Sequence, residues 1–236
     1  MALLEVKNLD VTLATSRGPA RAVRNLSFDL DRGQTLGIVG ESGCGKSMTA
    51  LALLGLLPEN RVTTGSINLD GQDLLTLNED AMCGVRGNRI SMIFQEPMTS
   101  LNPLHTIGRQ VTEPMLIHQG MTRDQARDEA VRLLERVGIA SAAQRLDSFP
   151  HQLSGGQRQR VMIAMALSCK PDVLIADEPT TALDVTIQGQ ILDLIADIVA
   201  EAGMALILIS HDLGVIAETV DQVLVMYGGA GVETGP

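Results

Sequence analysis

The sequence is poor in aromatic residues and in positive charge. It has no Trp, 1 Tyr and 3 Phe among 236 residues, and 18 Lys and Arg against 28 Asp and Glu leave a formal net charge of −10. Aromatic rings are the usual platforms on which bases stack, and clustered Lys and Arg are needed to neutralise phosphates. The composition therefore argues against a general nucleic-acid binder, and we expect no nucleic-acid partner.

Long hydrophobic runs are missing as well. No apolar stretch approaches the roughly 18 residues that a membrane-spanning helix needs, and the first 20 residues lack a signal-peptide pattern. The three cysteines, Cys44, Cys83 and Cys169, are an odd number at unrelated spacings. This usage suits a reducing cytoplasm and predicts neither a disulfide framework nor a metal site. A hydrophobic content of 45% is enough for one large domain, or for a core with a small subdomain.

What the sequence does contain is a phosphate-binding loop. Residues 40–47 form a G-x-x-x-x-G-K-S motif between a strand-like run, 35–39, and a helix-like run, 48–54. Glycines let successive backbone N–H groups point at phosphate oxygens, and the helix N-terminus adds partial positive charge. We expect Lys46 to reach the β- and γ-phosphates and the Ser47 hydroxyl to hold Mg²⁺. The residues predicted to contact the nucleotide here are Gly40, Glu41, Ser42, Gly43, Cys44, Gly45, Lys46, Ser47 and Met48.

The same loop holds a cysteine of predicted reactivity. Cys44 lies at a helix N-terminus beside Lys46, a setting that favours the thiolate. We therefore expect alkylation of Cys44 to inactivate the protein and bound nucleotide to protect it. The alternative is an inert small residue that fills the turn.

Two carboxylates follow an apolar run later in the chain. Val173–Ala176 is typical of a strand buried on both faces, and Asp177 and Glu178 come directly after it. Ligands of open α/β sheets bind at the carboxyl ends of strands. We expect Asp177 to orient Mg²⁺ through a water molecule and Glu178 to polarise the water that attacks the γ-phosphate. Taken alone, the stretch is equally compatible with an acidic turn.

A second anion site is predicted at Leu153-Ser154-Gly155-Gly156-Gln157. A helix N-terminus with two glycines and a serine binds anions, although Ser-x-x-Gln before apolar residues is also a simple capped helix. Two phosphate-binding N-termini in one chain suggest that the second one meets a nucleotide held by another protomer.

The periodicity predicts strands and helices on both sides of a helical insert, and we expect an α/β core with an antiparallel β edge and a helical subdomain. The helical part extends from Glu96 to about Leu153 and contains a capping box at Thr122–Gln125 and a stop at Gly138. We expect residues 1–95 and 157–236 to form the core and residues 96–156 to form the helical subdomain. Predicted strands are 3–13, 22–30, 35–39, a hairpin over 66–73, 89–94, 173–176, 205–209 and 222–227; predicted helices include one from 157 and one over 185–202.

Six motifs in this order resemble the nucleotide-binding subunits of ATP-binding cassette (ABC) transporters over essentially the whole chain. They are Walker A (Gly40–Ser47), the Q-loop glutamine (Gln95), the signature (Leu153–Gln157), Walker B with its glutamate (Val173–Glu178), the D-loop (Thr181–Asp184) and the switch histidine (His211). The resemblance implies a P-loop ATPase that binds ATP and Mg²⁺ and closes as a head-to-tail dimer around two nucleotides.

The resemblance also implies roles for single residues. Gln95 would contact Mg²⁺ and the attacking water and link them to the transmembrane partner, and His211 would bond the γ-phosphate. Ser154 and Gly156 would bind the γ-phosphate of the opposing protomer, with Gly155 and Gln157 beside them, and Asp184 would set the geometry across the interface. One departure is Leu13, where the family usually has an adenine-stacking ring, so we expect weak discrimination among nucleoside triphosphates.

A finer resemblance, to the dipeptide, oligopeptide and nickel importers, lies in residues 94–105 and 177–185. It implies two permeases, a second ATPase subunit (identical or paralogous), an extracytoplasmic solute-binding protein, and a peripheral place on the cytoplasmic face of the inner membrane. The solute would be a peptide or a related small molecule such as a nickel or metal chelate. Members of that group commonly continue for several dozen residues beyond the equivalent of Pro236, so the chain is either a shortened form or a compact member.

The resemblance places a groove for a permease helix just after Gln95. The apolar residues expected there are Met98, Leu101, Leu104 and Ile107, with packing inside the subdomain as the alternative for each of them. Two other classes of function remain open. An ABC ATPase that acts on DNA or ribosomes would share the catalytic set, and a nucleotide sensor without turnover would share the binding loop; the acidic charge opposes the first, and the presence of Glu178 and His211 opposes the second.

Overall fold

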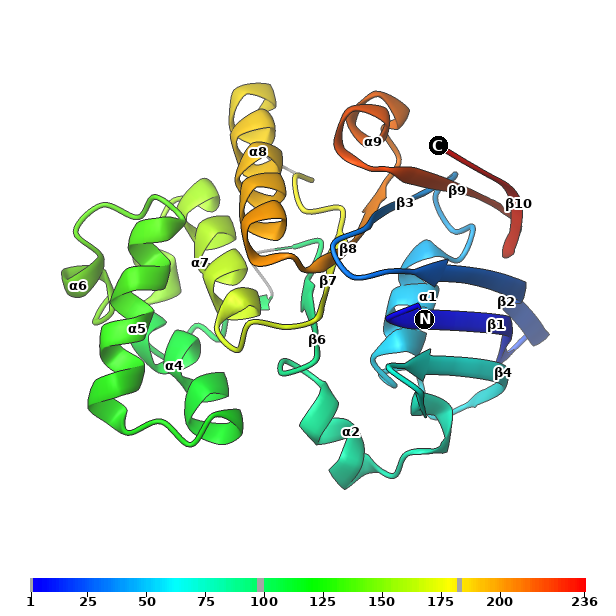
Figure 1. The fold of residues 1–236 in the computed structure, drawn as a ribbon, viewed down its shortest axis with the longest axis horizontal. Coiled ribbons are helices and arrows are strands. Elements are labelled where there is room, and N and C mark those ends of the chain that lie inside the picture. The colour runs from blue at the N-terminus through cyan, green and yellow to red at the C-terminus, as the bar shows by residue number, and fades with distance from the viewer. Residues whose placement is uncertain (1, 97–99, 182–183) are drawn as a thin grey trace. The chain divides into compact units, whose positions relative to one another are not determined.

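The computed structural model describes residues 2–96, 100–181 and 184–236, which form two compact units (Figure 1). The first unit comprises residues 1–86 and 203–236, and the second comprises residues 87–202. This division differs from the expected one, in which residues 96–156 stood alone. Strands β6 and β7 pair with each other, and helix α7 contacts β6 and α8, so these elements group with the helical segment.

An antiparallel sheet forms one part of the first unit. Its strands are β1 (Leu4–Thr15), β2 (Gly18–Leu30), β4 (Arg61–Leu69) and β5 (Gln72–Asp73), in the order β2-β1-β4-β5. The predicted hairpin is confirmed: Asp70 and Gly71 have φ of 52° and 85°, and Leu69 pairs with Gln72. Two successive residues with positive φ form the tight turn that matches the twist of antiparallel strands.

The other sheet of this unit is built around β3 (Thr35–Val39). This strand lies parallel between β8 (Ala205–Ser210) and β9 (Gln222–Tyr227), and β10 (Ala230–Gly235) pairs antiparallel with β9. The helices of the first unit are α1 (Lys46–Leu53), α2 (Glu79–Val85) and α9 (Leu213–Thr219), and it also contains a 3-10 turn, η1 (Leu74–Thr76). Since β3, β8 and β9 are parallel, the loops that follow them emerge at one edge of the sheet.

The second unit contains two parallel strands and a group of helices. The strands are β6 (Ile90–Ile93) and β7 (Val173–Asp177), and all five residues of β7 are buried. The helices are α4 (Ile107–His118), α5 (Arg123–Arg136), α6 (Ala142–Arg145), η2 (Pro150–Gln152), α7 (Gly155–Leu167) and α8 (Val185–Ala202). In the part of the chain that the structure describes, no helix is both long and apolar enough to cross a membrane.

Local sequence signals explain where these helices begin and end. In the capping box of α5, Thr122 N–H donates to Gln125 Oε1 (2.9 Å), and Gln125 N–H donates to Thr122 Oγ1 (3.3 Å). Gly138 and Gly203, with φ of 78° and 62°, follow α5 and α8 as predicted. Buried apolar residues of α4, α5 and α7 pack against one another to form the helical core.

Candidate functional site

The phosphate loop connects β3 to α1, and only glycine fits at two of its positions. Gly40 and Gly45 have φ of 155° and 104°. A Cβ on Gly40 would lie 2.2 Å from the Met226 carbonyl oxygen, and one on Gly45 would lie 2.3 Å from the Ala22 carbonyl oxygen. The loop is therefore held closely between β9 and β2, and its backbone shape depends on both of these distant strands.

Lys46 lies over this loop and is only 5% exposed. Its ammonium donates hydrogen bonds to the carbonyl oxygens of Gly40 (2.7 Å) and Glu41 (3.1 Å). An ammonium has three N–H donors, so one further donor can reach a phosphate oxygen above the loop. The next residue, Ser47, is exposed at the start of α1, where a hydroxyl can serve as a ligand for a cation.

The turn between β9 and β10 supports the loop from one side. Gly229 N–H donates to the Cys44 carbonyl oxygen (3.0 Å), and Arg24 N–H donates to the Gly229 carbonyl oxygen (2.7 Å). The sequence analysis assigned no role to this turn. Cys44 is 5% exposed, which favours the alternative that it fills the turn; inactivation by alkylation of Cys44 stays a prediction.

His211 lies at the same edge of the sheet as the loop. Val39 and Ser210 are partners in the pairing of β3 with β8, so Gly40 and His211 are the next residues of two adjacent parallel strands. Asp212, which follows, caps α9 by accepting a hydrogen bond from Gly214 N–H (2.9 Å). The first unit thus brings together the predicted phosphate loop and the predicted switch histidine.

In the second unit, the ends of β6 and β7 bring together three further predicted residues. Ile93 pairs with Ala176, so Gln95 and the acidic pair Asp177 and Glu178 leave the sheet at one edge. Gln95 Nε2 donates to Glu178 Oε2 (3.0 Å). Asp177 is 5% exposed.

Glu178 is held in an unusual conformation. Its φ is 47°, which costs a residue other than glycine about 1–3 kcal/mol and is typical of functional sites. Thr181 Oγ1 also donates to Glu178 Oε2 (2.9 Å). Thr181 was noted only as part of a motif, and the spacing Glu-x-x-Thr was the signal that could have identified this contact.

The Leu153–Gln157 stretch forms the N-terminus of α7, and the capped-helix interpretation is confirmed as its local structure. Ser154 Oγ accepts from Gln157 N–H (3.3 Å), and Gln157 Oε1 accepts from Ser154 N–H (3.0 Å). The helix is anchored by Arg158 Nε, which donates to the Pro150 carbonyl oxygen (2.7 Å). Since Gln157 has its oxygen in the cap, anion contacts at this end would come from backbone N–H groups, including those of Gly155 and Gly156.

Asp184 caps α8, because its Oδ1 accepts from Ile187 N–H (3.0 Å). The neighbouring Ala182 and Leu183 of the predicted D-loop lie outside the described residues. Leu13, the residue at the expected adenine position, is half-buried in β1 opposite Ala20 and Arg61.

The prediction of a permease groove is wrong for two of its four residues. Leu101 and Ile107 are 2% and 0% exposed, so they pack inside the subdomain as the alternative had it. Leu104 is 83% exposed, and Met98 lies outside the described residues. A hydrophobic hollow of about 170 Å³ lies beside Phe94, the residue before Gln95. Its lining also includes Met92, Pro114, Met162 and Met165.

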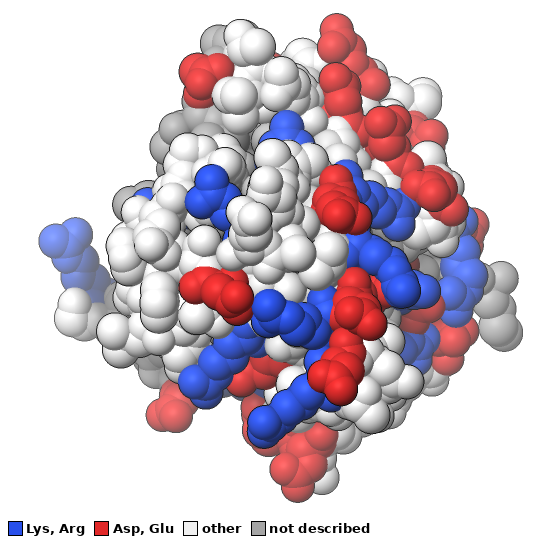
Figure 2. Space-filling view, turned by 90° about the vertical axis from the view of Figure 1, so that its left-hand side faces the viewer, with Lys and Arg blue, Asp and Glu red and all other residues white. Residues whose placement is uncertain are grey.

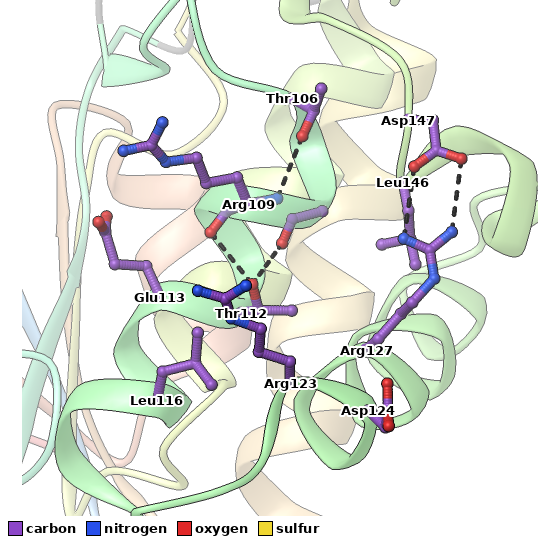
Figure 3. A pocket seen from close by; sticks show the side chains of 11 residues that line it. Thr106, Arg109, Thr112, Glu113, Leu116, Arg123, Asp124, Arg127, Leu146 and Asp147 are labelled. Carbon is purple, nitrogen blue, oxygen red and sulfur yellow. Dashed lines mark hydrogen bonds and ion pairs between the residues drawn. The ribbon is translucent and has the colours of Figure 1, made fainter.

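A larger cavity of about 480 Å³ lies between α4 and α5 and includes none of the predicted nucleotide-contacting residues (Figure 3). Arg109, Arg123 and Arg127 line it, and Arg127 forms an ion pair with Asp147 (3.3 Å). On the face shown in Figure 2, basic and acidic side chains are interspersed. The cavity has the character of a charged surface groove, distinct from the phosphate loop.

A glycine-rich loop between a parallel strand and a helix, with a lysine over it, defines a P-loop nucleotide-binding protein. The ABC transporter family model matches residues 23–181. The dipeptide transport ATP-binding protein DppD of Bacillus subtilis is 53% identical over 235 residues, which cover 99% of this chain and 70% of the relative. The oligopeptide transport ATP-binding protein OppD of Salmonella typhimurium is 53% identical over 233 residues, covering 99% and 70%.

Solved structures agree with this assignment. The ATP-binding cassette MJ0796, in a dimeric post-hydrolysis state bound to ADP and Pi, matches with a TM-score of 0.86 and 28% identity, covering 98% of this chain and 97% of that one. The protein cbiO1 of Clostridium perfringens, part of the ABC transporter complex cbiONQ, matches with a TM-score of 0.82 and 28% identity, covering 99% of this chain and 88% of that one. The chain belongs to the ABC transporter family. It is an ABC-type ATPase, and the predicted fold class is confirmed.

Proposed function

We propose that this ATPase powers the uptake of peptides through partner permeases. The observation that carries the proposal is an identity above 50% to dipeptide and oligopeptide transport ATP-binding proteins across 98–99% of the chain. A transport-coupled ATPase of this kind associates peripherally with the cytoplasmic face of the inner membrane, where its permeases lie. A solute-binding protein outside the membrane would deliver the peptide, and a nickel or metal chelate is the alternative solute.

ATP hydrolysis would use the two groups of residues described above. The phosphate loop and Lys46 bind the β- and γ-phosphates, His211 bonds the γ-phosphate, and Glu178 orients and polarises the attacking water. Two donors on Glu178 Oε2, from Gln95 and Thr181, fix the direction of that carboxylate. Catalysis of this type consists mainly of positioning and charge stabilisation.

The residues present fit Mg²⁺. Ser47 offers an exposed hydroxyl at the start of α1, Asp177 a carboxylate, and Gln95 an amide oxygen, which are the oxygen ligands that this ion prefers. When bound, Mg²⁺ would neutralise charge on the phosphates. With Leu13 in place of an aromatic ring, adenine would be held without stacking, and other nucleoside triphosphates should compete well with ATP.

Turnover would require a second ATPase subunit, identical or paralogous. The N-terminus of α7, with Ser154, Gly155, Gly156 and Gln157, would bind the γ-phosphate of a nucleotide held by the partner, and Asp184 would contribute to the same interface. A helix N-terminus suits this role because its unpaired N–H groups and dipole favour an anion.

The permease contact would be the hydrophobic hollow beside Gln95. Phe94 is 41% exposed, and the flexible methionines Met162 and Met165 can adapt to an inserted apolar side chain. Because Phe94 directly precedes Gln95, a partner side chain in this hollow would act on the residue that bonds Glu178.

The proposal is tested by co-expression with peptide permeases and a peptide-binding protein from the same genome, followed by reconstitution into liposomes. Uptake of labelled di- and oligopeptides with matched ATP hydrolysis is the expected result. ATP hydrolysis without peptide uptake, together with uptake of a nickel chelate, would contradict the peptide assignment. Met165→Asp should uncouple uptake from hydrolysis, whereas Arg123→Ala, in the charged cavity, should not; the reverse pattern would place the permease at that cavity.

A further inference from the structure

The helix that carries Lys46 is short, and its far end is closed tightly. Helix α1 has 8 residues, and Gly55, with φ of 62°, follows it. Gly55 N–H donates to the Ala52 carbonyl oxygen (3.1 Å), and Leu56 N–H donates to the Leu51 carbonyl oxygen (2.9 Å). These two bonds form a Schellman-type end. The carbonyl group of Leu54 stands at this end, where the negative pole of the helix lies, and that of Gly55 follows it.

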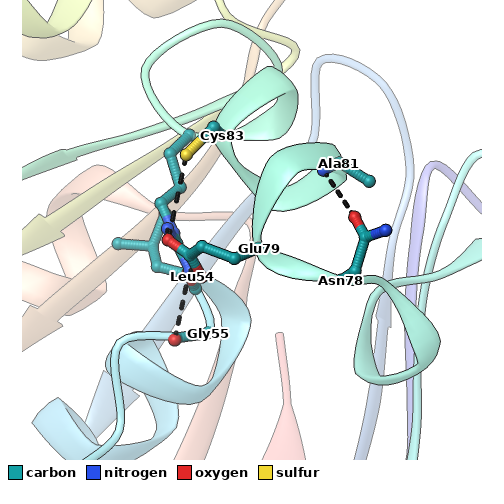
Figure 4. A network of polar contacts seen from close by, with 7 residues as sticks. Leu54, Gly55, Asn78, Glu79, Ala81 and Cys83 are labelled. Carbon is teal, nitrogen blue, oxygen red and sulfur yellow. Dashed lines mark hydrogen bonds and ion pairs between the residues drawn. The ribbon is translucent and has the colours of Figure 1, made fainter.

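Arg86 donates hydrogen bonds to both of those carbonyl groups, which belong to Leu54 and Gly55, labelled in Figure 4. Its Nε donates to the Leu54 carbonyl oxygen (2.7 Å), and its Nη2 donates to the Gly55 carbonyl oxygen (3.3 Å). The Arg86 side chain is 19% exposed, and it packs closely against Gly55, since a Cβ on Gly55 would lie 3.2 Å from Nη2. A planar guanidinium can serve two carbonyl groups and a carboxylate at once, which an ammonium cannot do with the same geometry.

Glu79 holds the other side of the same guanidinium. It forms an ion pair with Nη1 of Arg86, and Nη2 donates to Glu79 Oε2 (3.1 Å). Glu79 is the first residue of α2, whose start is fixed by Asn78, the acceptor of a bond from Ala81 N–H (2.9 Å). The hydrogen bond between the two side chains holds the pKa of Glu79 below its ordinary value and that of Arg86 above it. Helix α2 is thereby linked through one side chain to the end of α1.

A second arginine holds the chain just beyond this point. Arg61, the first residue of β4, donates from Nη1 to the carbonyl oxygens of Leu57 (3.2 Å) and Pro58 (3.0 Å). The segment that follows α1 is therefore anchored from both β4 and α2. Arg61 contacts the loop after the helix, whereas Arg86 contacts the end of the helix itself.

We propose that Arg86 is a positioning residue for nucleotide binding, which fixes α1 at its C-terminal end and so sets the position of Lys46 and of the N–H groups at the other end. It acts through the helix and touches no nucleotide. The reasoning rests on ATP binding by the family and is independent of the peptide assignment. A shift of α1 by a fraction of an ångström moves Lys46 and the N–H groups of the first helical turn together, so the effect falls on ATP affinity rather than on the chemical step.

The test compares Arg86→Ala, Arg86→Lys and Glu79→Gln with Arg132→Ala. Arg132 forms a surface ion pair with Glu129 within α5, in the other unit. The KM for ATP and kcat would be measured by phosphate release, and the Kd with a fluorescent ATP analogue, well below the unfolding temperature of each variant. We expect Arg86→Ala to raise KM and Kd about 3–30-fold with kcat nearly unchanged, since hydrogen bonds to a charged group are lost.

The other variants separate positioning from general stability. Arg86→Lys should recover only part of the affinity and Glu79→Gln should lose a smaller part, while Arg132→Ala should equal the wild type. The exchanged pair Glu79→Arg with Arg86→Glu restores the ion pair without donors to Leu54 and Gly55, so it should not recover the affinity. A folded Arg86→Ala protein with wild-type KM and Kd, or full recovery in the exchanged pair, would overturn the proposal. If Arg86→Ala does not fold, the ATP affinities of Arg86→Lys and Glu79→Gln test the proposal instead. Wild-type affinity in both of these variants would overturn the proposal.

Discussion

Gln95 donates a hydrogen bond to Glu178 across 3.0 Å, although 83 positions separate them in the sequence. The contact arises because β6 and β7 are parallel and in register, with Ile93 opposite Ala176. Gln95 and Glu178 each lie two positions beyond this pair, so both are brought to one edge. Any partner that moves the segment around Gln95 would change the direction of the Glu178 carboxylate.

Replacing Glu178 by Gln should separate ATP binding from hydrolysis. The amide oxygen can still accept the bonds from Gln95 and Thr181, but the basic carboxylate is lost. We expect turnover to fall by ~10²–10⁴-fold, the usual scale for a general base, while the ATP-bound dimer accumulates. Phosphate release and light scattering with MgATP measure the two effects. Near-normal turnover would remove Glu178 from this role, and lost ATP binding would show that it is structural.

Two further substitutions should prevent the dimer for different reasons. Lys46→Ala removes the ammonium above the phosphate loop, so ATP binding itself should weaken. Ser154→Arg places a long side chain at the N-terminus of α7, so each monomer should bind ATP normally and fail to close. ATP affinity and molar mass, measured on the same samples, distinguish these outcomes. If closure requires a paralogous ATPase, the trapped species will be a heterodimer and this chain alone will stay monomeric.

Alanine at two glycines of the loop should have unequal effects. At Gly40 the new Cβ would lie 2.2 Å from the Met226 carbonyl oxygen, whereas at Gly43 it would have nothing within 4 Å, although φ is 80°. Gly43→Ala should therefore weaken ATP binding by up to about tenfold, through backbone strain of 1–2 kcal/mol. Gly40→Ala should abolish binding, because β9 would have to move. Equal affinities in the two variants would show that β9 does not support the loop.

Thiol labelling should distinguish the three cysteines in the folded chain. Cys83 is exposed, while Cys44 and Cys169 are 5% and 6% exposed. Burial also raises the pKa of the Cys169 thiol, which slows its reaction further. A maleimide should modify Cys83 first, as peptide mapping by mass spectrometry would show, and kcat for ATP hydrolysis, measured by phosphate release, should stay intact. Labelling of Cys44 as fast as Cys83, with loss of activity, would restore the expectation of a reactive loop thiol.

The pair of Glu79 and Arg86 should contribute to stability in a pH-dependent way. The hydrogen bond from Arg86 holds the pKa of Glu79 below its ordinary value of 4.5. A carboxyl whose pKa is lower in the folded state stabilises that state above its unfolded pKa, and the contribution is lost as the pH falls through the folded value. The difference in urea midpoint between wild type and Glu79→Gln should be constant from pH 7 to about 5 and shrink at lower pH. A difference that grows on acidification would contradict the assigned pair.

The sequence by itself determined the features that depend on residues close together in the chain. The phosphate loop, the capping boxes at Thr122 and Ser154, the turn at Asp70-Gly71 and the helix end at Gly203 are such features. Each arises from hydrogen bonds or backbone angles within a few positions, so the residue types alone specify it. The order of these motifs also indicated the family, which the comparisons confirmed.

Only the tertiary structure decided which side chains are buried and which distant ones meet. Leu101 and Leu104 are the same residue type three positions apart, yet one is 2% and the other 83% exposed. Cys44 is covered, Gly40 fits against Met226, and Arg86 reaches the end of α1, because strands and helices remote in sequence pack there. Burial and long-range contact depend on the arrangement of the whole chain, and no local pattern carries that information.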